Sequence, residues 1–258
     1  IALKGVVMLI YTYVSSILFS FLYQLSANDH FDKRYLKLRS KCDYCKSKLK
    51  YYDFIPIFSF LILKGKSRCC KQPLKYSYLI GELLAILPIL LIYYQLININ
   101  PQFYLTTFLF LLVMSINDIE DYCISLIFLM IFTTVLLFTT PIFLNTFLLT
   151  FIISHLFFIL MYRYIGYGDI LLFNILSLFL PINFMFYLFL FTFMIGGILS
   201  IIIKIFFNHN IKYVPLIPFI FLSFVFVSSF YPSLTEIMGG VPFWGLKKWL
   251  IRRNHVND

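Results

Sequence analysis

The feature that most constrains this chain is a series of apolar runs, each about 20 residues long, that recurs along most of its length. A helix of about 20 residues crosses the hydrocarbon core of a membrane. Within lipid the backbone must satisfy its own hydrogen bonds, so each run is expected to be an α-helix. Of the residues, 61% are hydrophobic and only 12% are charged, which leaves too little polar surface for a water-soluble globule. The sequence therefore predicts an all-α, polytopic transmembrane bundle.

The apolar runs predict about eight helices, with breaks at turn-forming residues such as Asn100-Pro101 and Pro141. The first run has no small-residue cleavage site, so a retained anchor is expected rather than a removed signal peptide. The expected helices cover residues 6–26, 76–97, 102–117, 124–139, 141–162, 170–185, 187–207 and 214–231. The domains that follow are a first transmembrane helix (1–26), a basic cytoplasmic cysteine loop (27–75), a transmembrane core (76–231) and an amphipathic basic tail (232–258).

The charge is concentrated in one loop. The formal net charge is +10, and 13 of the 21 Lys and Arg residues lie between Lys33 and Lys75. The positive-inside rule places such a loop in the cytoplasm, where it faces the lipid bilayer rather than nucleic acid. Alternate crossings then bring residues 117–123, 163–169 and 208–212 to the cytoplasmic side. Eight crossings would place the tail outside, yet residues 243–250 form a basic amphipathic pattern. Either the tail returns to the cytoplasmic face or the number of crossings differs by one.

Two aspartates are the candidate catalytic residues. The chain has only 11 acidic residues, and a carboxylate at an apolar segment is a functional hypothesis by default. Asp118 and Asp169 are separated by two expected crossings, so both can lie at the cytoplasmic boundary. Two carboxyl groups brought together in a low dielectric share one proton, as in aspartic proteases, and can activate water. Gly166 and Gly168 beside Asp169 permit close backbone approach. The spacing permits this dyad but does not establish contact.

Four cysteines form a candidate metal site in the basic loop. Cys42 and Cys45 are followed 24 residues later by Cys69 and Cys70, a pattern typical of a four-thiolate zinc site. Thiols in the cytoplasm stay reduced, which disfavours disulfides.

The motifs as a set resemble those of bacterial prepilin peptidases, also called type IV leader peptidases. Asp118-Ile119 and Gly166-Tyr167-Gly168-Asp169 resemble the family's two catalytic aspartate motifs. The loop resembles the family's cytoplasmic domain over Lys41–Cys45, Tyr52–Phe60, Leu63–Lys66, Cys70-Lys71, Tyr78 and Glu82, and Pro215 and Pro218 resemble its late proline-rich turn.

The resemblance implies a bifunctional aspartic endopeptidase of the bacterial cytoplasmic (inner) membrane. It would remove the basic leader of prepilin or pseudopilin precursors after a glycine, and then methylate the new amino terminus with S-adenosylmethionine. Such precursors serve type IV pili, secretion or competence. Asp118 and Asp169 carry over as the catalytic pair, and the cysteine loop as a Zn²⁺ element. Glu82 either pairs with a loop Lys or Arg or belongs to the methyl-transfer site.

Three positions depart from the family pattern. Ser67 stands where the third metal ligand is expected; Cys69 is the substitute, and strain is expected because adjacent side chains point in different directions. Ser125 replaces a proline after the first catalytic aspartate, and Gln24 replaces an arginine at the end of the first helix. Two other classes stay open, a membrane transporter and a non-catalytic membrane scaffold. A transporter would usually show paired broken helices or an internal repeat, which this sequence does not display.

Overall fold

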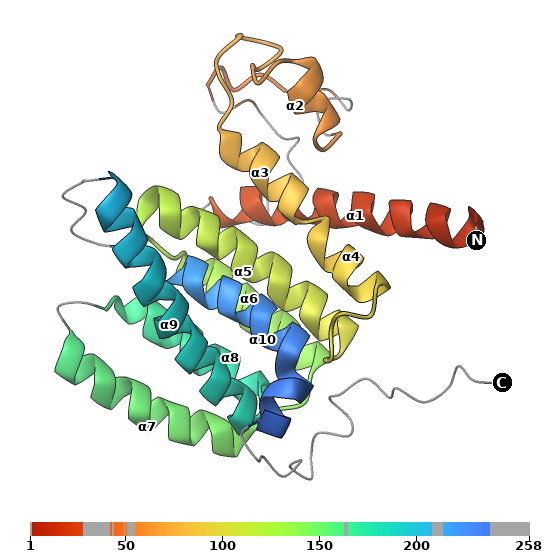
Figure 1. The fold of residues 1–258 in the computed structure, drawn as a ribbon. Coiled ribbons are helices and arrows are strands. Elements are labelled where there is room, and N and C mark those ends of the chain that lie inside the picture. The colour runs from red at the N-terminus through yellow and green to blue at the C-terminus, as the bar shows by residue number, and fades with distance from the viewer. Residues whose placement is uncertain are drawn as a thin grey trace. The chain divides into compact units, whose positions relative to one another are not determined.

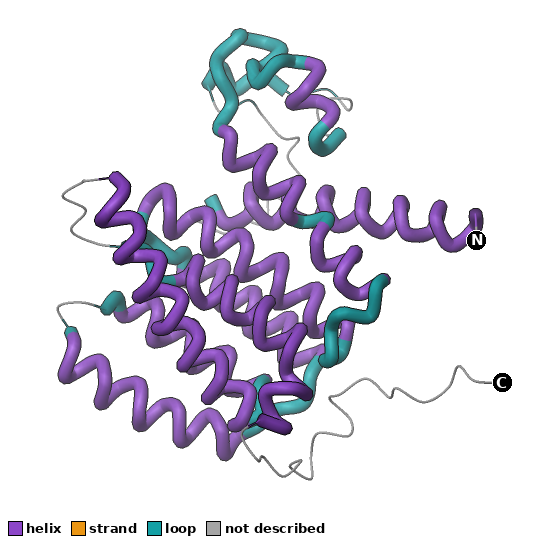
Figure 2. Tube along the Cα trace, viewed as in Figure 1, coloured by secondary structure: helices purple, strands orange, loops and turns teal. Residues whose placement is uncertain are grey.

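The computed structural model describes residues 2–27, 42, 44–48, 50, 55–162, 165–207 and 214–237. The expected amphipathic segment 243–250, most of residues 27–54 and part of the 163–169 turn lie outside the described residues. In the described part the fold is helical, with helices joined by loops (Figures 1 and 2). The helices are α1 (Ala2–Ser26), α2 (Phe58–Ile62), α3 (Tyr76–Leu84), α4 (Leu87–Tyr93), α5 (Pro101–Asp121), α6 (Leu126–Thr139), α7 (Leu144–Met161), α8 (Tyr167–Phe179), α9 (Ile182–Phe207) and α10 (Ile217–Ile237).

The predicted all-α membrane fold is confirmed. Among the described residues, six segments are long and apolar enough to cross a membrane, and the apolar helices α6 and α8 are shorter. Several boundaries differ from those expected; for example, the helix expected over 170–185 ends at Phe179, and α9 begins at Ile182 rather than at residue 187. The helix expected over 76–97 is divided into α3 and α4, α10 continues past residue 231, and α5 continues to Asp121. Asp118 therefore lies within the last turns of a helix rather than in a polar loop.

The chain divides into two compact units, residues Ile1–Tyr94 and Gln95–Asp258. In the first unit, serines of α1 contact the break between α3 and α4. The hydroxyl of Ser15 donates to the carbonyl of Ala85 at 2.6 Å, and that of Ser16 donates to the carbonyl of Glu82 at 2.9 Å. Pro88 at the start of α4 has no N–H, so a continuous helix cannot satisfy every carbonyl here. The serines supply donors that lipid cannot.

A close approach of α1 and α3 depends on a glycine. A Cβ atom built on Gly81 would lie 1.9 Å from Cζ of Phe19, whose side chain is fully buried. Phe19 also stacks with Tyr23, which meets Tyr78 edge-on with ring centroids 5.0 Å apart. Gly81 therefore creates the space in which an aromatic cluster joins α1 to α3.

The second unit is built around α5, which is buried along most of its length. Tyr104 stacks on Phe224 of α10, and Phe110 packs against Phe128 of α6. The start of α5 is capped by Asn100, whose side-chain oxygen accepts from the amide of Gln102 at 2.9 Å, and Pro101 occupies the first helical position. Through these contacts α5 packs against both α6 and α10 and forms the centre of the second unit.

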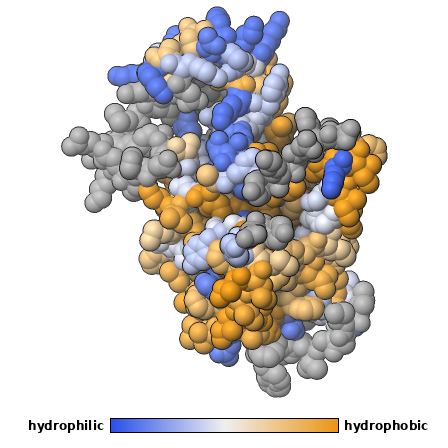
Figure 3. All heavy atoms as spheres, turned by 90° about the vertical axis from the view of Figure 1, so that its left-hand side faces the viewer, coloured by the Kyte–Doolittle hydropathy of each residue, from blue (hydrophilic) through white to orange (hydrophobic). Residues whose placement is uncertain are grey.

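By contrast, α7 is mostly exposed and packs mainly along α8. Its side chains Ile152, Leu156, Ile159 and Leu160 are each more than half exposed. Hydrophobic residues also cover much of the middle and lower part of the face shown in Figure 3. Such a surface suits contact with lipid chains and would be unfavourable in water.

Candidate active site and cysteine cluster

Asp118 is buried near the C-terminal end of α5 and accepts hydrogen bonds from the start of α10. Its Oδ2 atom lies 3.1 Å from the backbone nitrogen of Ile217, the first residue of α10, and it also accepts from the amide of Leu216. Amides in the first turn of a helix have no intrahelical partner and carry the positive end of the helix dipole. The carboxyl group of Asp118 satisfies them from a different helix.

Asp169 lies in the first turn of α8. Its backbone amide donates to the carbonyl of Gly166 at 3.2 Å, which closes the turn that begins the helix. The C-terminal end of α5 and the N-terminal ends of α8 and α10 lie at the same end of the bundle (Figure 1). Asp118 and Asp169 are close enough for the charge of one carboxyl group to act on the other. The structure thus places the two predicted catalytic aspartates in one region of the second unit.

The two glycines before Asp169 lie in confined positions. A Cβ atom on Gly168 would lie 2.8 Å from Cδ1 of Ile124, in the connection between α5 and α6. A Cβ atom on Gly166 would lie 3.3 Å from Oδ2 of Asp169 itself. Gly168 therefore lets the start of α8 approach the segment that follows Asp118. In that connection, Ser125 caps α6 by accepting from the amide of Phe128 at 3.4 Å, so a serine provides the helix start at this position.

A pair of carboxyl groups in this setting can perform general acid–base chemistry. One carboxylate takes a proton from water while the other, protonated, donates to a carbonyl oxygen. The apolar surroundings favour sharing of a single proton between neighbouring carboxyl groups, because two adjacent negative charges repel strongly there. The chemistry that fits is hydrolysis of an amide bond presented at this end of the bundle.

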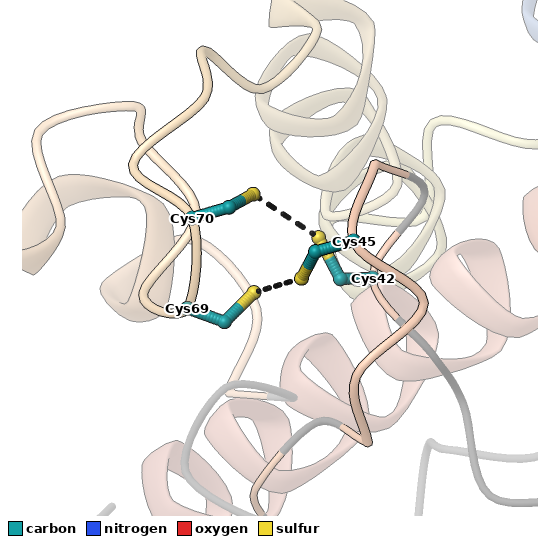
Figure 4. Close-up of side chains that lie close together, drawn as sticks. All are labelled: Cys42, Cys45, Cys69 and Cys70. Atoms are coloured by element: carbon teal, nitrogen blue, oxygen red, sulfur yellow. Dashed lines mark hydrogen bonds between the residues drawn. The ribbon is translucent and has the colours of Figure 1, made fainter.

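The first unit holds a compact group of four cysteine sulfurs. Cys42 and Cys45 come from one loop segment and Cys69 and Cys70 from another, and their side chains point toward one another (Figure 4). The four sulfurs lie within 4.8 Å of one another, with Cys42 to Cys70 at 3.8 Å and Cys45 to Cys69 at 3.1 Å. Tetrahedral zinc with Zn–S bonds of about 2.3 Å requires sulfur separations of about 3.8 Å. The donor set therefore fits a four-thiolate metal ion.

Ser67 has a supporting place beside this cluster. It is buried, its hydroxyl oxygen lies 3.0 Å from the sulfur of Cys70, and it accepts from the amide of Gln72 at 3.0 Å. The adjacent Cys69 and Cys70 face Cys45 and Cys42 respectively (Figure 4). Strain was expected because Cys69 and Cys70 are adjacent in the chain, but the sulfurs of both residues lie in the cluster. Cys69 supplies the fourth sulfur, while Ser67 holds the turn that carries it.

The exposed thiol of Cys45 is prepared for metal binding by a hydroxyl neighbour. Its sulfur lies 3.0 Å from the hydroxyl oxygen of Ser47. The hydrogen bond that Cys45 shares with Ser47, and then the one that it shares with Cys69, lower the pKa of Cys45 to about 6. Metals bind the thiolate rather than the thiol, so this pKa favours the form that coordinates. The sequence motif did not identify Ser47, which lies two residues beyond the second cysteine.

Glu82 is buried in the first unit and its carboxylate is held by two donors. Oε1 accepts from the hydroxyl of Ser20 on α1, and Oε2 accepts from the amide of Ile57, each at 2.6 Å. Ile57 precedes α2 with φ of 63°, a conformation that is unfavourable for a β-branched residue. In the described residues Glu82 thus joins α1, α3 and this turn, and the donors to its carboxylate are a hydroxyl and an amide, not a Lys or Arg side chain.

The first third of the chain is similar to known proteins. Residues 13–96 match the model of the bacterial peptidase A24 N-terminal domain. Three relatives named prepilin leader peptidase/N-methyltransferase are also similar. The protein of Vibrio cholerae is 35% identical over 89 residues, that of Klebsiella pneumoniae 46% over 44, and that of Pectobacterium carotovorum 39% over 51.

These matches are partial. They cover 31%, 17% and 20% of this chain and 35%, 19% and 18% of the respective relatives. The chain therefore spans about a third or less of the length of the relatives that it matches. No solved structure matches the chain. The domain match includes the cysteine cluster and Glu82 and ends before Asp118. The family resemblance inferred from the motifs is confirmed, whereas the catalytic roles of Asp118 and Asp169 stay a prediction.

Proposed function

On the premise that residues 13–96 are a bacterial peptidase A24 N-terminal domain, we propose that this chain is a membrane aspartic endopeptidase that removes the leader of prepilin-like proteins. The observation that carries the proposal is the placement of Asp118 and Asp169 at one end of the bundle, where their charges interact. The relatives' name, prepilin leader peptidase/N-methyltransferase, supports the substrate class. The location is the bacterial cytoplasmic membrane, with the active site near its inner face.

In the proposed reaction, the dyad hydrolyses the peptide bond after the leader. Water attacks the scissile carbonyl carbon as one aspartate takes its proton and the other protonates the carbonyl oxygen. The apolar helix that follows the leader lies among the transmembrane helices, so the scissile bond meets the carboxyl groups at the membrane boundary. Substrate positioning of this kind makes the attack effectively intramolecular.

Zinc is the metal that we propose for the cysteine cluster. Cys42, Cys45, Cys69 and Cys70 would hold it, and a closed four-thiolate site contributes folding energy rather than catalysis. Bound zinc would join the two loop segments that carry the cysteines.

A second activity, methylation of the new amino terminus by S-adenosylmethionine, is supported by the relatives' name. A role of Glu82 in it stays a prediction, because its carboxylate is already held by Ser20 and Ile57. Labelled S-adenosylmethionine tests the activity, and a mature amino terminus without label would reject it.

Cleavage of a prepilin-like peptide by the purified protein in detergent or lipid tests the peptidase. We expect cleavage by the wild type and none by Asp118→Asn or Asp169→Asn. Either substitution removes one of the two carboxyl groups that share the proton, so the acid–base pair is lost. Full cleavage by both variants would reject the dyad. No cleavage by a folded wild-type protein would favour the transporter or the scaffold.

A further inference from the structure

The carboxyl groups of Asp118 and Asp169 have different hydrogen-bond surroundings. Asp118 accepts from two amides at the start of α10, those of Ile217 and Leu216. Asp169 has one backbone partner, Gly166, within its own turn, and it faces the charge of Asp118. An amide can only donate, so each amide bond favours a carboxylate, which only accepts, over a carboxylic acid.

This difference decides which group holds the shared proton. The N-terminal end of α10 adds the positive end of its dipole to the two hydrogen bonds at Asp118. These direct donors outweigh the negative end of the α5 dipole, where Asp118 lies. Asp169 also lies near the positive end of a helix dipole, that of α8. With one amide donor instead of two, its carboxylate is stabilised less than that of Asp118. A negative charge on Asp118 then makes a second charge on Asp169 unfavourable.

From this geometry we infer that Asp118 is the carboxylate that activates water and that Asp169 is the carboxylic acid; the inference rests on the proposed function. As the water oxygen bonds to the carbonyl carbon, a water proton moves to Asp118 and the proton of Asp169 moves to the carbonyl oxygen. In the second step the proton on Asp118 moves to the amide nitrogen, the C–N bond breaks, and a hydroxyl proton returns to Asp169. The start of α10, which touches no substrate in this scheme, is a positioning element for Asp118.

The amide of Ile217 can be removed without removing the helix. Proline has no N–H and is well tolerated at the first helical position, where Ile217 stands. Ile217→Pro therefore deletes the hydrogen bond to Asp118, whereas Ile217→Ala keeps the amide and deletes the side chain. The two variants form a matched pair, and both are compared with the wild type for helix content and thermal unfolding.

The measurement is the pH dependence of kcat/KM for cleavage of a prepilin-like peptide. The acid limb reports ionisation of the base, and the alkaline limb reports loss of the acid's proton. For Ile217→Pro we expect the acid limb to move to higher pH by roughly one to two units, with the alkaline limb in place. Ile217→Ala should leave both limbs where they are in the wild type.

A shift of the alkaline limb alone in Ile217→Pro would reverse the assignment, because Asp118 would then hold the proton. If neither limb moves in Ile217→Pro, the start of α10 does not position or stabilise the carboxylate of Asp118. If Ile217→Pro does not fold, Leu216→Pro with Leu216→Ala as control removes the second amide and provides the same test. A wild-type protein that cleaves nothing would reject the proposed function itself, which is a separate outcome from either limb result.

Discussion

Oδ2 of Asp118 lies 3.1 Å from the backbone nitrogen of Ile217, which is 99 residues later in the chain. This hydrogen bond joins the end of α5 to the start of α10. It gives Asp118 a structural function in addition to its proposed catalytic one, since the buried amide has no partner within its own helix. A substitution at Asp118 is therefore expected to affect both activity and stability.

Asp118→Ala should destabilise the protein by about 1–3 kcal/mol, because it leaves buried amides at the start of α10 without an acceptor. Asp118→Asn keeps a side-chain oxygen that can accept a hydrogen bond, so its loss of stability should be smaller than that of Asp118→Ala. Chemical unfolding in mixed micelles measures both. Equal stability of Asp118→Ala and the wild type would show that the bond contributes nothing, and a folded, inactive Asp118→Asn separates catalysis from stability.

Removal of one thiol should abolish high-affinity zinc binding. We expect about one zinc per wild-type chain, and a large loss in Cys69→Ser, because a four-thiolate site depends on every ligand. Cys123→Ser is the matched control, since Cys123 is exposed and lies outside the cluster. Elemental analysis of the purified variants gives the stoichiometry. Full zinc content in Cys69→Ser would exclude Cys69 as a ligand.

Gly81→Ala should destabilise the first unit by about 1–3 kcal/mol or more, because the added methyl group would overlap the buried ring of Phe19. Gly197→Ala is the control, because a Cβ atom there meets no neighbour within 4 Å. Thermal unfolding compares the two variants. Partial recovery in Gly81→Ala combined with Phe19→Leu would identify the overlap as the cause, and an unchanged Gly81→Ala would contradict it.

Glu82→Gln should cost about 1.5–3 kcal/mol, because a neutral amide is a weaker acceptor for Ser20 and Ile57 than a carboxylate. Glu236→Gln, at an exposed position of α10, should be nearly neutral. Hydrogen exchange at the amide of Ile57 gives a local measurement, with faster exchange expected in Glu82→Gln alone. The same exchange rate in all three proteins would mean that Glu82 does not hold this turn.

The membrane fold could be predicted because lipid allows few alternatives for apolar runs. The break at Asn100-Pro101 was also predicted, since the effect of turn-forming residues is local. The division of α3 from α4 was not predicted, although Pro88 was a visible signal, because the run 76–97 is mostly apolar. Hydropathy reports where a segment lies and carries little information on where its backbone bends.

The candidate site was predictable in its residue types and not in its contacts. The spacing of Asp118 and Asp169 allowed them to share one end of the bundle, yet no local pattern linked Asp118 to Ile217. Pro215 and Pro218 marked the start of a helix, but they did not identify the partner of its first amides. Contacts between residues far apart in sequence depend on packing, which one sequence read by itself does not provide.

The serines of α1 that contact the interruption between α3 and α4 have a consequence for biogenesis. A bent helical segment whose carbonyl groups lack hydrogen bonds enters the bilayer unfavourably, unless a neighbouring helix already provides hydrogen-bond donors. Ser15 and Ser16 lie on α1, which is synthesised before α3 and α4, so their hydroxyl donors are present when the later segment enters the membrane. We therefore expect the loss of Ser15 and Ser16 to reduce the integration of the α3–α4 segment into the membrane.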